Sequence, residues 1–374
     1  MAAASGTHWC AYPDPSCPSG YRYSDFQVGE GLSGVCVIST IDAGVPPDTV
    51  LVCRRRVAFT DGAQDHGDIW VANPDGSGLV NVSDNTAEDA NPSWSPDGLR
   101  LAFQSNREGN FDIFSVNYDG SGLVNLTKGN VTGDYLPVWS PDGTRIAFVR
   151  ASSTPPFNST VWVMNANGTG ATQISNLTFS SDLAWSPTGN KVVFGFYDAN
   201  IPPHAKVPLL YVAGVGTGTS PIKLTAQIDI GEQRASWAPG SKIAFDNASD
   251  VITADESGAN LLNITQSVGH NFAPHFTHNG GKIAFTSDRD NGHQEVWLVD
   301  ANGANAAQVT HNTALNGADF VTDISSDDVL VAYTHATSPT KTEAAVSSVD
   351  GVTNNTFNAP GGNNARGVKF SACP

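Results

Sequence analysis

The chain of 374 residues has few charged side chains, and basic ones are especially scarce. Only 15% of the residues are charged, and 19 lysines and arginines face 36 aspartates and glutamates, which gives a net charge of −17. Such a charge repels nucleic acid and anionic lipid, so we expect no nucleic-acid partner. No apolar run reaches the roughly 18 residues that a bilayer requires, so we expect no membrane span.

Several motifs of known chemistry are also missing. The five cysteines form no Cys-x-x-Cys pair, which disfavours a zinc ribbon or a thioredoxin-like site. Neither a Gly-x-Ser-x-Gly elbow nor a P-loop occurs, so we expect neither a complete serine hydrolase nor a P-loop nucleotide-binding protein. The opening residues 1–6 have no basic or apolar stretch, as expected where a signal peptide is absent. These absences leave open whether the protein is an enzyme.

Glycine and proline, by contrast, are plentiful, with 37 and 22 residues. This composition favours many short strands joined by turns over long helices. The phrase Trp-Ser-Pro-Asp-Gly stands at Trp94–Gly98 and at Trp139–Gly143, and altered copies begin at Trp185 and Trp237. A tryptophan followed by a proline-glycine turn therefore opens a repeating unit.

Each unit continues in the same way. In the second unit an apolar strand ending at Phe103 is followed by Asp112-Ile-Phe114, by the turn Asp119–Gly122 and by the closing strand Val124–Leu126. Four short strands with glycine turns are typical of antiparallel hairpins. The sequence therefore predicts four-stranded antiparallel sheets.

The spacing of the units gives their number. Successive copies lie 39 to 52 residues apart, close to the length of one propeller blade. The predicted fold is all-β, a seven-bladed β-propeller whose first blade is closed by the C-terminal strand Arg366–Phe370. The tryptophan-equivalent positions are Trp94, Trp139, Trp185, Trp237, Phe276, Ile324 and Phe370.

The succession Trp-Ser-Pro-Asp-Gly, Ile-Ala-Phe, Asp-Ile-Trp, Asp-Gly-Ser-Gly and Asn-Leu-Thr resembles the TolB-like propeller repeat, a WD-like repeat. The resemblance covers residues 50 to 374 approximately and implies the propeller fold. It does not decide the function, because this repeat serves protein-binding, peptidase-associated and polysaccharide-cleaving proteins alike.

The repeat register also divides the chain. We expect a cysteine-containing N-terminal segment at residues 1–46 and the propeller at residues 47–374. In this register Cys53 and Cys373 fall in one hairpin turn of the first blade, so we predict a disulfide between them.

Three further cysteines lie in the N-terminal segment. One pair among Cys10, Cys17 and Cys36 is expected to form a disulfide, and which pair is left open. Because disulfides persist in oxidising compartments, the sequence predicts an extracellular or periplasmic location.

Candidate metal ligands stand five positions before the tryptophan-equivalents, where the inner strands begin. Oxygen ligands favour calcium or magnesium over zinc, so we predict a possible Ca²⁺ at the channel mouth and no other cofactor. The alternative is that these acids only bond to backbone amides in turns. The predicted ligands are Asp89, Asp134, Glu232 and Asp319.

Candidate ligand-binding residues at the same mouth are His270, Asn271, Arg234 and Arg366. They suggest a non-catalytic binding propeller that holds a protein or a carbohydrate. The alternative is a carbohydrate-active enzyme, a polysaccharide lyase or a glycoside hydrolase, with its site at the central channel. A lyase for uronates must hold an anionic sugar, and the acidic residues expected at the channel mouth argue against such a substrate.

The acids of the third strands recur at one place in the repeat. Repetition favours a structural hydrogen bond over a unique site for Asp68, Asp112 and Glu295. We also expect Arg107 and Arg289, in the loops after the second strands, to bond within their own blades.

Overall fold

A computed structural model gives the fold of the chain. The residues that the structure describes are 11–13, 21–23, 55–63, 66–151, 159–176, 179–196, 209–216, 220–224, 235–247, 249–290, 292–312, 317–338, 340–360, 362 and 364–372. β1 (Ala11–Pro13) and β2 (Tyr21–Tyr23) pair as a two-stranded antiparallel sheet. The remaining strands belong to a compact unit, Arg56–Ala372.

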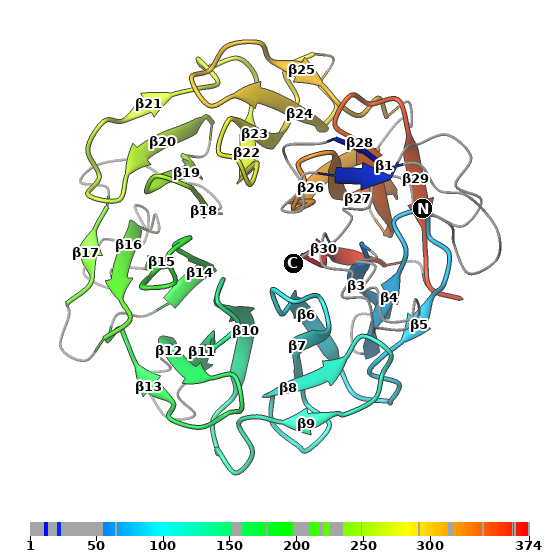
Figure 1. Cartoon of the computed structure of the whole chain (residues 1–374), viewed down its shortest axis with the longest axis vertical. Coiled ribbons are helices and arrows are strands. Elements are labelled where there is room, and N and C mark those ends of the chain that lie inside the picture. Colours follow the sequence, from blue (N-terminus) through cyan, green and yellow to red (C-terminus); the bar gives the residue numbers. More distant parts are fainter. Residues whose placement is uncertain are drawn as a thin grey trace. The chain divides into compact units, whose positions relative to one another are not determined.

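That unit contains seven four-stranded antiparallel sheets arranged as blades in a ring (Figure 1). We use the word channel for the region along the axis of this ring, which the innermost strand of each blade faces. From the channel outward, the first blade consists of β30 (Arg366–Phe370), β3 (Val57–Ala63), β4 (His66–Ala72) and β5 (Val80–Asn81). The second consists of β6 (Asp89–Trp94), β7 (Arg100–Ser105), β8 (Asp112–Asn117) and β9 (Val124–Asn125). The third consists of β10 (Asp134–Trp139), β11 (Arg145–Ala151), β12 (Ser159–Asn165) and β13 (Thr172–Gln173).

The other four blades repeat this order. The fourth consists of β14 (Phe179–Trp185), β15 (Lys191–Phe196), β16 (Leu209–Gly214) and β17 (Ile222–Lys223). The fifth consists of β18 (Ala235–Ala238), β19 (Lys242–Asp246), β20 (Val251–Asp255) and β21 (Leu262–Asn263). The sixth consists of β22 (Asn271–Phe276), β23 (Lys282–Ser287), β24 (Glu295–Asp300) and β25 (Ala307–Gln308). The seventh consists of β26 (Ala318–Ile324), β27 (Leu330–Ser338), β28 (Lys341–Ser348) and β29 (Asn354–Phe357).

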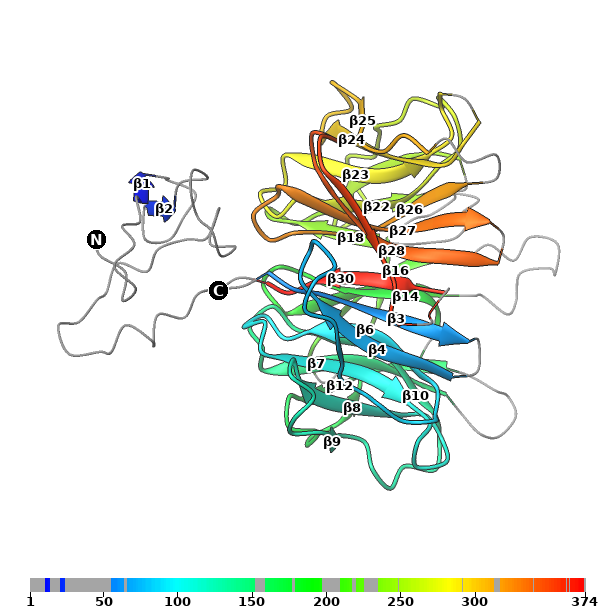
Figure 2. The ribbon, with the colours of Figure 1, turned by 90° about the vertical axis from the view of Figure 1, so that its right-hand side faces the viewer.

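The predicted fold class is confirmed, including the closure of the first blade by the C-terminal strand. β30 lies antiparallel to β3, with Val57 opposite Phe370 (Figure 2). Just beyond the strands, the Ser371 amide donates to the Arg56 carbonyl at 2.8 Å, and the Arg56 amide donates to Ser371 Oγ at 2.9 Å. These bonds join the two ends of the propeller unit in one blade.

The core lies between neighbouring blades. The second strands each bury one aromatic ring completely, and the inner-strand tryptophans pack beside these rings. Because interiors are close-packed, each blade depends on its neighbours for burial of its faces. The fully buried second-strand rings are Phe59, Phe103, Phe148, Phe194, Phe245, Phe285 and Tyr333.

The inner strands share one local geometry, which decides what faces the channel. We number their residues so that the tryptophan-equivalent is position 6, which makes Asp89 position 1 and Trp94 position 6. At position 3, Asn91, Leu136 and Ala273 have φ of 56°, 51° and 55°, in the left-handed region. The register with the second strand shifts there, which marks a β-bulge.

The bulge adds one residue to the normal alternation of a strand. Positions 1, 4 and 6 are buried within the blades, whereas position 5 and most residues at position 2 are partly exposed. Positions 2 and 5 therefore line the channel. We call the end of the channel near position 1, where the inner strands begin, the mouth.

Hydrogen bonds that recur at the same place in different blades connect neighbouring inner strands. The backbone amide of Trp139 donates to Ser93 Oγ at 3.1 Å, and the amide of Phe276 donates to Ser236 Oγ at 3.0 Å. In each pair a position-6 amide binds a position-5 side chain of the preceding blade.

Several predictions from the sequence lie outside the described residues. They concern all five cysteines, including the Cys53–Cys373 disulfide, and the boundary between residues 46 and 47. These stay predictions. Within the described ranges, no helix is long and apolar enough to cross a membrane.

Asp61 on β3 anchors the connection that leads into β30. Its side chain is buried, and its carboxylate accepts the Ala359 amide at 2.9 Å and the Asn364 amide at 3.1 Å. The two amides lie 298 and 303 residues further along the chain. One carboxylate thus fixes the path of the closing strand.

We expect Asp61→Ala to lower the free energy of unfolding by about 2–4 kcal/mol, because it leaves the buried Ala359 amide and the partly buried Asn364 amide without acceptors. Chemical denaturation of the whole chain measures this. Asp75→Ala is the matched control, since Asp75 also accepts two hydrogen bonds but in an exposed turn. Equal losses in both variants would contradict the anchoring role of Asp61.

Candidate functional site

The acids at position 1 face into their blades. Asp89 and Asp134 are fully buried. Asp89 Oδ2 accepts Arg107 Nη2 at 3.0 Å, and Asp134 accepts Arg150 through Nε at 2.7 Å and Nη2 at 2.9 Å. Charge-assisted hydrogen bonds of this kind compensate the burial of both charges.

Each of these arginines also covers an aromatic pair. The Arg107 guanidinium lies 5.4 Å and 4.9 Å from the ring centroids of Phe103 and Phe114. Arg150 lies 5.2 Å from Phe148 and 4.6 Å from Trp162. Cation–π contacts at these distances orient the guanidinium toward the inner strand. We call a cation in this place the blade cap.

The sixth blade also has an arginine as its blade cap, Arg289, but the side chain that it binds is the neutral Asn271. Asn271 is fully buried, and its Oδ1 accepts Ser287 Oγ at 2.7 Å and Arg289 Nη2 at 3.0 Å. Burial lowers the pKa of Arg289 from its ordinary value. The prediction that Arg107 and Arg289 bond within their own blades is confirmed. The arginine of the third blade was missed, because Arg150 stands on the second strand itself and not in the loop after it.

The seventh blade replaces the arginine by a histidine. His335 Nδ1 lies 2.6 Å from Asp319 Oδ1, and this hydrogen bond raises the pKa of His335 against the effect of burial. Glu295, from the sixth blade, accepts Thr310 Oγ1 and the Asn312 amide, both at 2.6 Å, and the Asn312 side-chain amide lies 3.4 Å from Asp319 Oδ1. Burial raises the pKa of Glu295 to about 7, and the charge of Asp319 adds to this rise.

The four predicted metal ligands are therefore placed as follows. Asp89, Asp134 and Asp319 each bind a cap of their own blade, and Glu232 lies outside the described residues. Among the residues that the structure describes, no three histidine, cysteine or carboxylate side chains come together as a metal site would require. The cation at the mouth stays a prediction. The sequence argument assumed that the position-1 side chains face the channel. In the structure the alternation of the inner strands turns position 1 into the blade and position 2 toward the channel.

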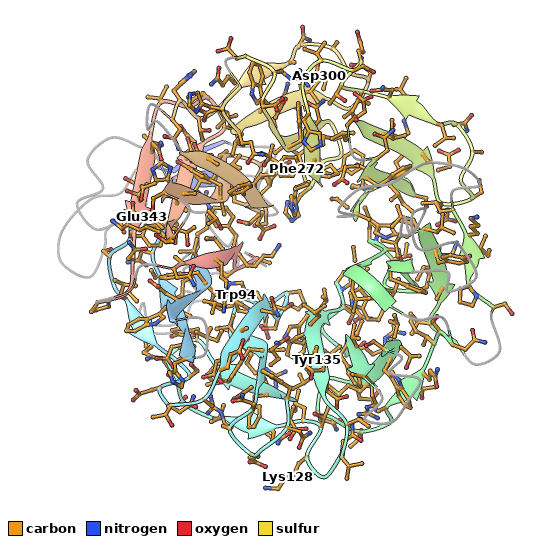
Figure 3. The ribbon with its side chains drawn as sticks, turned by 180° about the vertical axis from the view of Figure 1, so that it is seen from behind. Trp94, Lys128, Tyr135, Phe272, Asp300 and Glu343 are labelled. Carbon is orange, nitrogen blue, oxygen red and sulfur yellow. The ribbon has the colours of Figure 1, made fainter. Side chains whose placement is uncertain are left out.

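Position 2 supplies the side chains at the mouth. It holds Tyr135, Phe272, Phe320 and Arg366, all partly exposed. Figure 3 shows Tyr135 and Phe272 at the channel ends of their blades, while Lys128 lies at the outer edge. A search for aromatic residues four positions before the tryptophan-equivalents would have found the first three.

Two of these rings form a continuous group with a histidine. The centroids of Phe272 and Phe320 lie 6.2 Å apart across the boundary between the sixth and seventh blades, and His270 lies 5.6 Å from Phe272. His270 is exposed, and its backbone amide donates to Asp288 Oδ1 at 2.6 Å. We call His270, Phe272 and Phe320 the mouth platform.

The predicted ligand-binding residues thus separate in space. His270 lies at the mouth, and Arg366 lines the channel on β30, while Asn271 is buried as part of a cap. Arg234 lies outside the described residues.

The prediction that the third-strand acids make structural hydrogen bonds is confirmed. Asp112 accepts Asn125 Nδ2 at 2.8 Å and Thr127 Oγ1 at 3.3 Å, and Thr127 Oγ1 accepts the Ile113 amide at 3.0 Å. Burial raises the pKa of Asp112. Equivalent bonds join Asp68 to Asn81 and Ser83, and Glu295 to Thr310.

We expect Arg150→Met to lower the free energy of unfolding by about 3–5 kcal/mol, because it leaves the Asp134 charge buried and unpaired. Adding Asp134→Asn should recover part of the loss, since Asn271 shows that an amide fits this position. Lys282→Met, which breaks the exposed Lys282–Asp300 pair, should change stability by less than about 1 kcal/mol. Thermal and chemical denaturation measure all three, and a loss in Arg150→Met no larger than in Lys282→Met would contradict the cap.

Comparisons with known proteins agree with this architecture. Residues 53–239, half of the chain, match the family model described as TolB beta propeller domain. TolB from Acinetobacter baumannii is similar at 17% identity and a TM-score of 0.54, over 87% of this chain and 69% of that one. The β-propeller domain of the trilobed protease from Pyrococcus furiosus is similar at 14% identity and a TM-score of 0.58, over 82% and 92%. An oligogalacturonate lyase in complex with manganese is similar at 12% identity and a TM-score of 0.55, over 80% and 84%.

At these identities the likeness concerns the fold. The Pyrococcus furiosus domain is described as having an open velcro topology, whereas β30 closes the first blade here. The family match, the four-stranded blades and the repeat together show that this chain belongs to the TolB β-propeller domain family.

Proposed function

We propose that this protein is a non-catalytic binding propeller that holds a glycan on the mouth platform, in an extracellular or periplasmic setting. The observation that carries the proposal is the group formed by the exposed ring of His270 and the partly exposed rings of Phe272 and Phe320. The location rests on the predicted disulfide.

The platform is built on fixed strands. Phe272 and Phe320 belong to inner strands whose next residues are anchored to the preceding blade: the Ala273 amide donates to Asp246 Oδ2, and the Val321 amide donates to Thr286 Oγ1, both at 3.0 Å. Sites on strands hold their side chains more accurately than sites on loops. The rings are therefore set in place before a ligand arrives.

The size of the platform favours a sugar over a protein surface. It consists of three rings whose neighbouring centroids lie 5.6 Å and 6.2 Å apart. A stable protein interface uses roughly 20–30 residues on each side. Three adjacent rings suit the apolar face of one or two sugar units.

The charges near the platform do not form an acidic ring. The acids at position 1 are buried and bound to caps, so they present no carboxylates to a ligand in the channel. An acidic sugar is then not repelled by them. The similarity to an oligogalacturonate lyase makes oligogalacturonate the first probe.

The environment of the Glu295 and Asp319 carboxyl groups supports binding without cleavage. Glu295 and Asp319 are buried and bound within the protein, Glu295 to Thr310 Oγ1 and the Asn312 amide and Asp319 to His335, so neither carboxyl group is exposed to a sugar in the channel. A glycosidase pair needs carboxyl groups separated by about 5 Å or more, on either side of the scissile bond. This pair therefore does not favour the enzymatic alternative.

Calorimetry with tetragalacturonate and with cellotetraose tests the proposal. We expect binding of at least one probe, and Phe272→Ala and Phe320→Ala should each weaken it by roughly 3- to 10-fold, because each removes a stacking surface.

Tyr135→Ala is the matched control, since Tyr135 is a position-2 aromatic residue in the third blade, away from the platform. It should leave the affinity unchanged. Titrations with Ca²⁺ and with EDTA report on the predicted cation. Absence of heat with both sugars would contradict a glycan ligand, and shortened sugar chains after incubation would favour the enzymatic alternative.

A further inference from the structure

The turns at the end of the channel opposite the mouth follow one pattern. In the second and third blades the residues after the tryptophan are Ser-Pro-Asp-Gly, and the glycines have φ of 65° and 68°. Neighbouring turns approach closely: a Cβ atom placed on Gly143 would lie 3.1 Å from Pro96 Cγ, and one on Gly280 would lie 3.3 Å from Pro239 Cδ. The proline of one blade therefore lies against the glycine of the next.

His278 and Asp328 replace this proline and this glycine at the boundary between the sixth and seventh blades. His278 stands at the proline place of the turn 277–280, and Asp328 stands at the glycine place of the turn 325–328. Asp328 keeps the backbone of the glycine, with φ of 61°. This conformation is unfavourable for a residue with a Cβ atom, so contacts of the Asp328 side chain have to offset its cost.

The Asp328 carboxylate binds the turn of the sixth blade. Its Oδ1 accepts the His278 amide at 2.5 Å, and its Oδ2 accepts the Asn279 amide at 3.0 Å. A proline at position 278 would have no amide hydrogen to donate. The half-exposed His278 ring lies beside the same carboxylate, with Nδ1 at 3.5 Å from Oδ1. The two departures from the repeat thus complement each other, and we call the His278–Asp328 contact the turn lock.

The acids around the turn lock come from the seventh blade. Asp323 on β26 acts on the charge of the His278 ring, as Asp328 does, and the Asp323 carboxylate also accepts the Phe370 amide at 2.9 Å. Asp327, in the same turn as Asp328, accepts a hydrogen bond from the Ser325 hydroxyl at 2.7 Å. These negative charges favour a protonated ring at His278.

The cations on the strands beside the turn lock are engaged elsewhere. Lys282, the first residue of β23, pairs with Asp300 at 2.5 Å. Lys369 on β30 donates to the Thr322 carbonyl at 2.5 Å. Asp328 forms its own ion pair with His278, so the strength of this pair depends on whether the ring is protonated.

The direction of the pH effect follows from the two members of the pair. Burial lowers the pKa of His278, but the hydrogen bond to Asp328 and the charges of Asp323 and Asp328 outweigh it, so the pKa lies above its ordinary value of 6.5. Burial raises the pKa of Asp328, but its bonds to His278 and Asn279 outweigh it, so the pKa lies below 3.8.

Each shift gives one limit of the pH range in which the turn lock is strong. The contribution of His278 to stability is fully present below pH 6.5 and is lost as pH rises through its raised pKa. The contribution of Asp328 is present above pH 3.8 and is lost as pH falls through its lowered pKa. The turn lock is therefore strongest at mildly acidic pH.

The turn lock and the mouth platform lie on the same blade boundary, at opposite ends of two inner strands. β22 carries Phe272 near its start and leads into the turn of His278, and β26 carries Phe320 near its start and leads into the turn of Asp328. The two rings meet at the mouth, with centroids 6.2 Å apart, and the turn lock joins the chain beyond the other ends of the strands.

We propose that His278 and Asp328 form a pH-dependent lock between the sixth and seventh blades, closed by an imidazolium–carboxylate pair at mildly acidic pH and weakened at alkaline pH. In the weakened state a neutral ring no longer attracts the carboxylate, while the two amide bonds to Asp328 remain. The turn lock thereby sets how firmly these two blades hold together at the end of the channel opposite the mouth.

NMR titration of the whole protein with ¹³C-labelled histidine tests the pair without a ligand. The His278 signal is the one that is missing from His278→Gln, and its midpoint in the wild type should lie above 6.5. Asp328→Asn should lower this midpoint, because asparagine tolerates the left-handed backbone and accepts the same amides but carries no charge. Asp97→Asn is the control, since Asp97 accepts the Leu99 amide within the equivalent turn of the second blade, and it should leave the midpoint unchanged.

Chemical denaturation over a series of pH values measures what the turn lock contributes to folding. The ratio of the unfolding constant of Asp328→Asn to that of the wild type should be larger at about pH 6 than at about pH 9, by roughly 1.5- to 5-fold, as for other partly exposed ion pairs. The same ratio for Asp97→Asn should stay level over this range.

The double variant His278→Pro with Asp328→Gly restores the turn pattern of the second and third blades. It should be more stable than either single variant, because each single change leaves one member of the pair without its partner. Its unfolding constant relative to the wild type should depend on pH as that of Asp328→Asn does.

Several results would overturn the turn lock. They are a wild-type His278 midpoint at or below 6.5, a midpoint that Asp328→Asn leaves unchanged, the same pH dependence of stability in Asp328→Asn and wild type, and additive losses in the double variant. If Asp328→Asn does not fold, the double variant takes its place in the denaturation series, and the wild-type midpoint of His278 decides together with it.

Discussion

The antiparallel pairing of β30 with β3 is the constraint on which the ring depends. Each blade buries its faces only against its two neighbours, so a ring left open would expose two of them. The bonds between Arg56 and Ser371 and the bonds from Asp61 to the connection before β30 hold the last strand in the first blade. With the ring closed, the inner strands of all seven blades surround one axis, and their side chains can act together at the channel mouth.

The protein as a whole is acidic, but the position-1 acids do not present their charge at the channel mouth, and the blade caps explain why. Asp89 and Asp134 are neutralised inside their blades by arginines that also pack on aromatic rings. The same arrangement is repeated with small changes, an asparagine in the sixth blade and a histidine in the seventh. Repetition makes most caps structural, and the seventh blade departs from the pattern by using a histidine in place of an arginine.

The fold could be predicted from the sequence because several blades carry the same pattern of strands and turns. Trp94, Trp139 and the equivalent residues fix the blade spacing, and the strand Arg366–Phe370 matches the piece that the first blade lacks. The role of Asp112 followed in the same way, since a residue that recurs with the repeat serves the repeat. His270 was placed at the mouth from its position just before an inner strand.

The sequence by itself determined the seven blades, their strand order and the closure, because periodicity and turn residues encode local structure. Only the tertiary structure decided which residues reach the channel. The bulge at Asn91, Leu136 and Ala273 changes the alternation of the inner strands, so position 2 faces the channel and position 1 does not. The bond from the Ala273 amide to Asp246 Oδ2 also joins residues of two blades. Contacts between blades depend on how the blades pack, and the sequence pattern of one blade does not encode that packing.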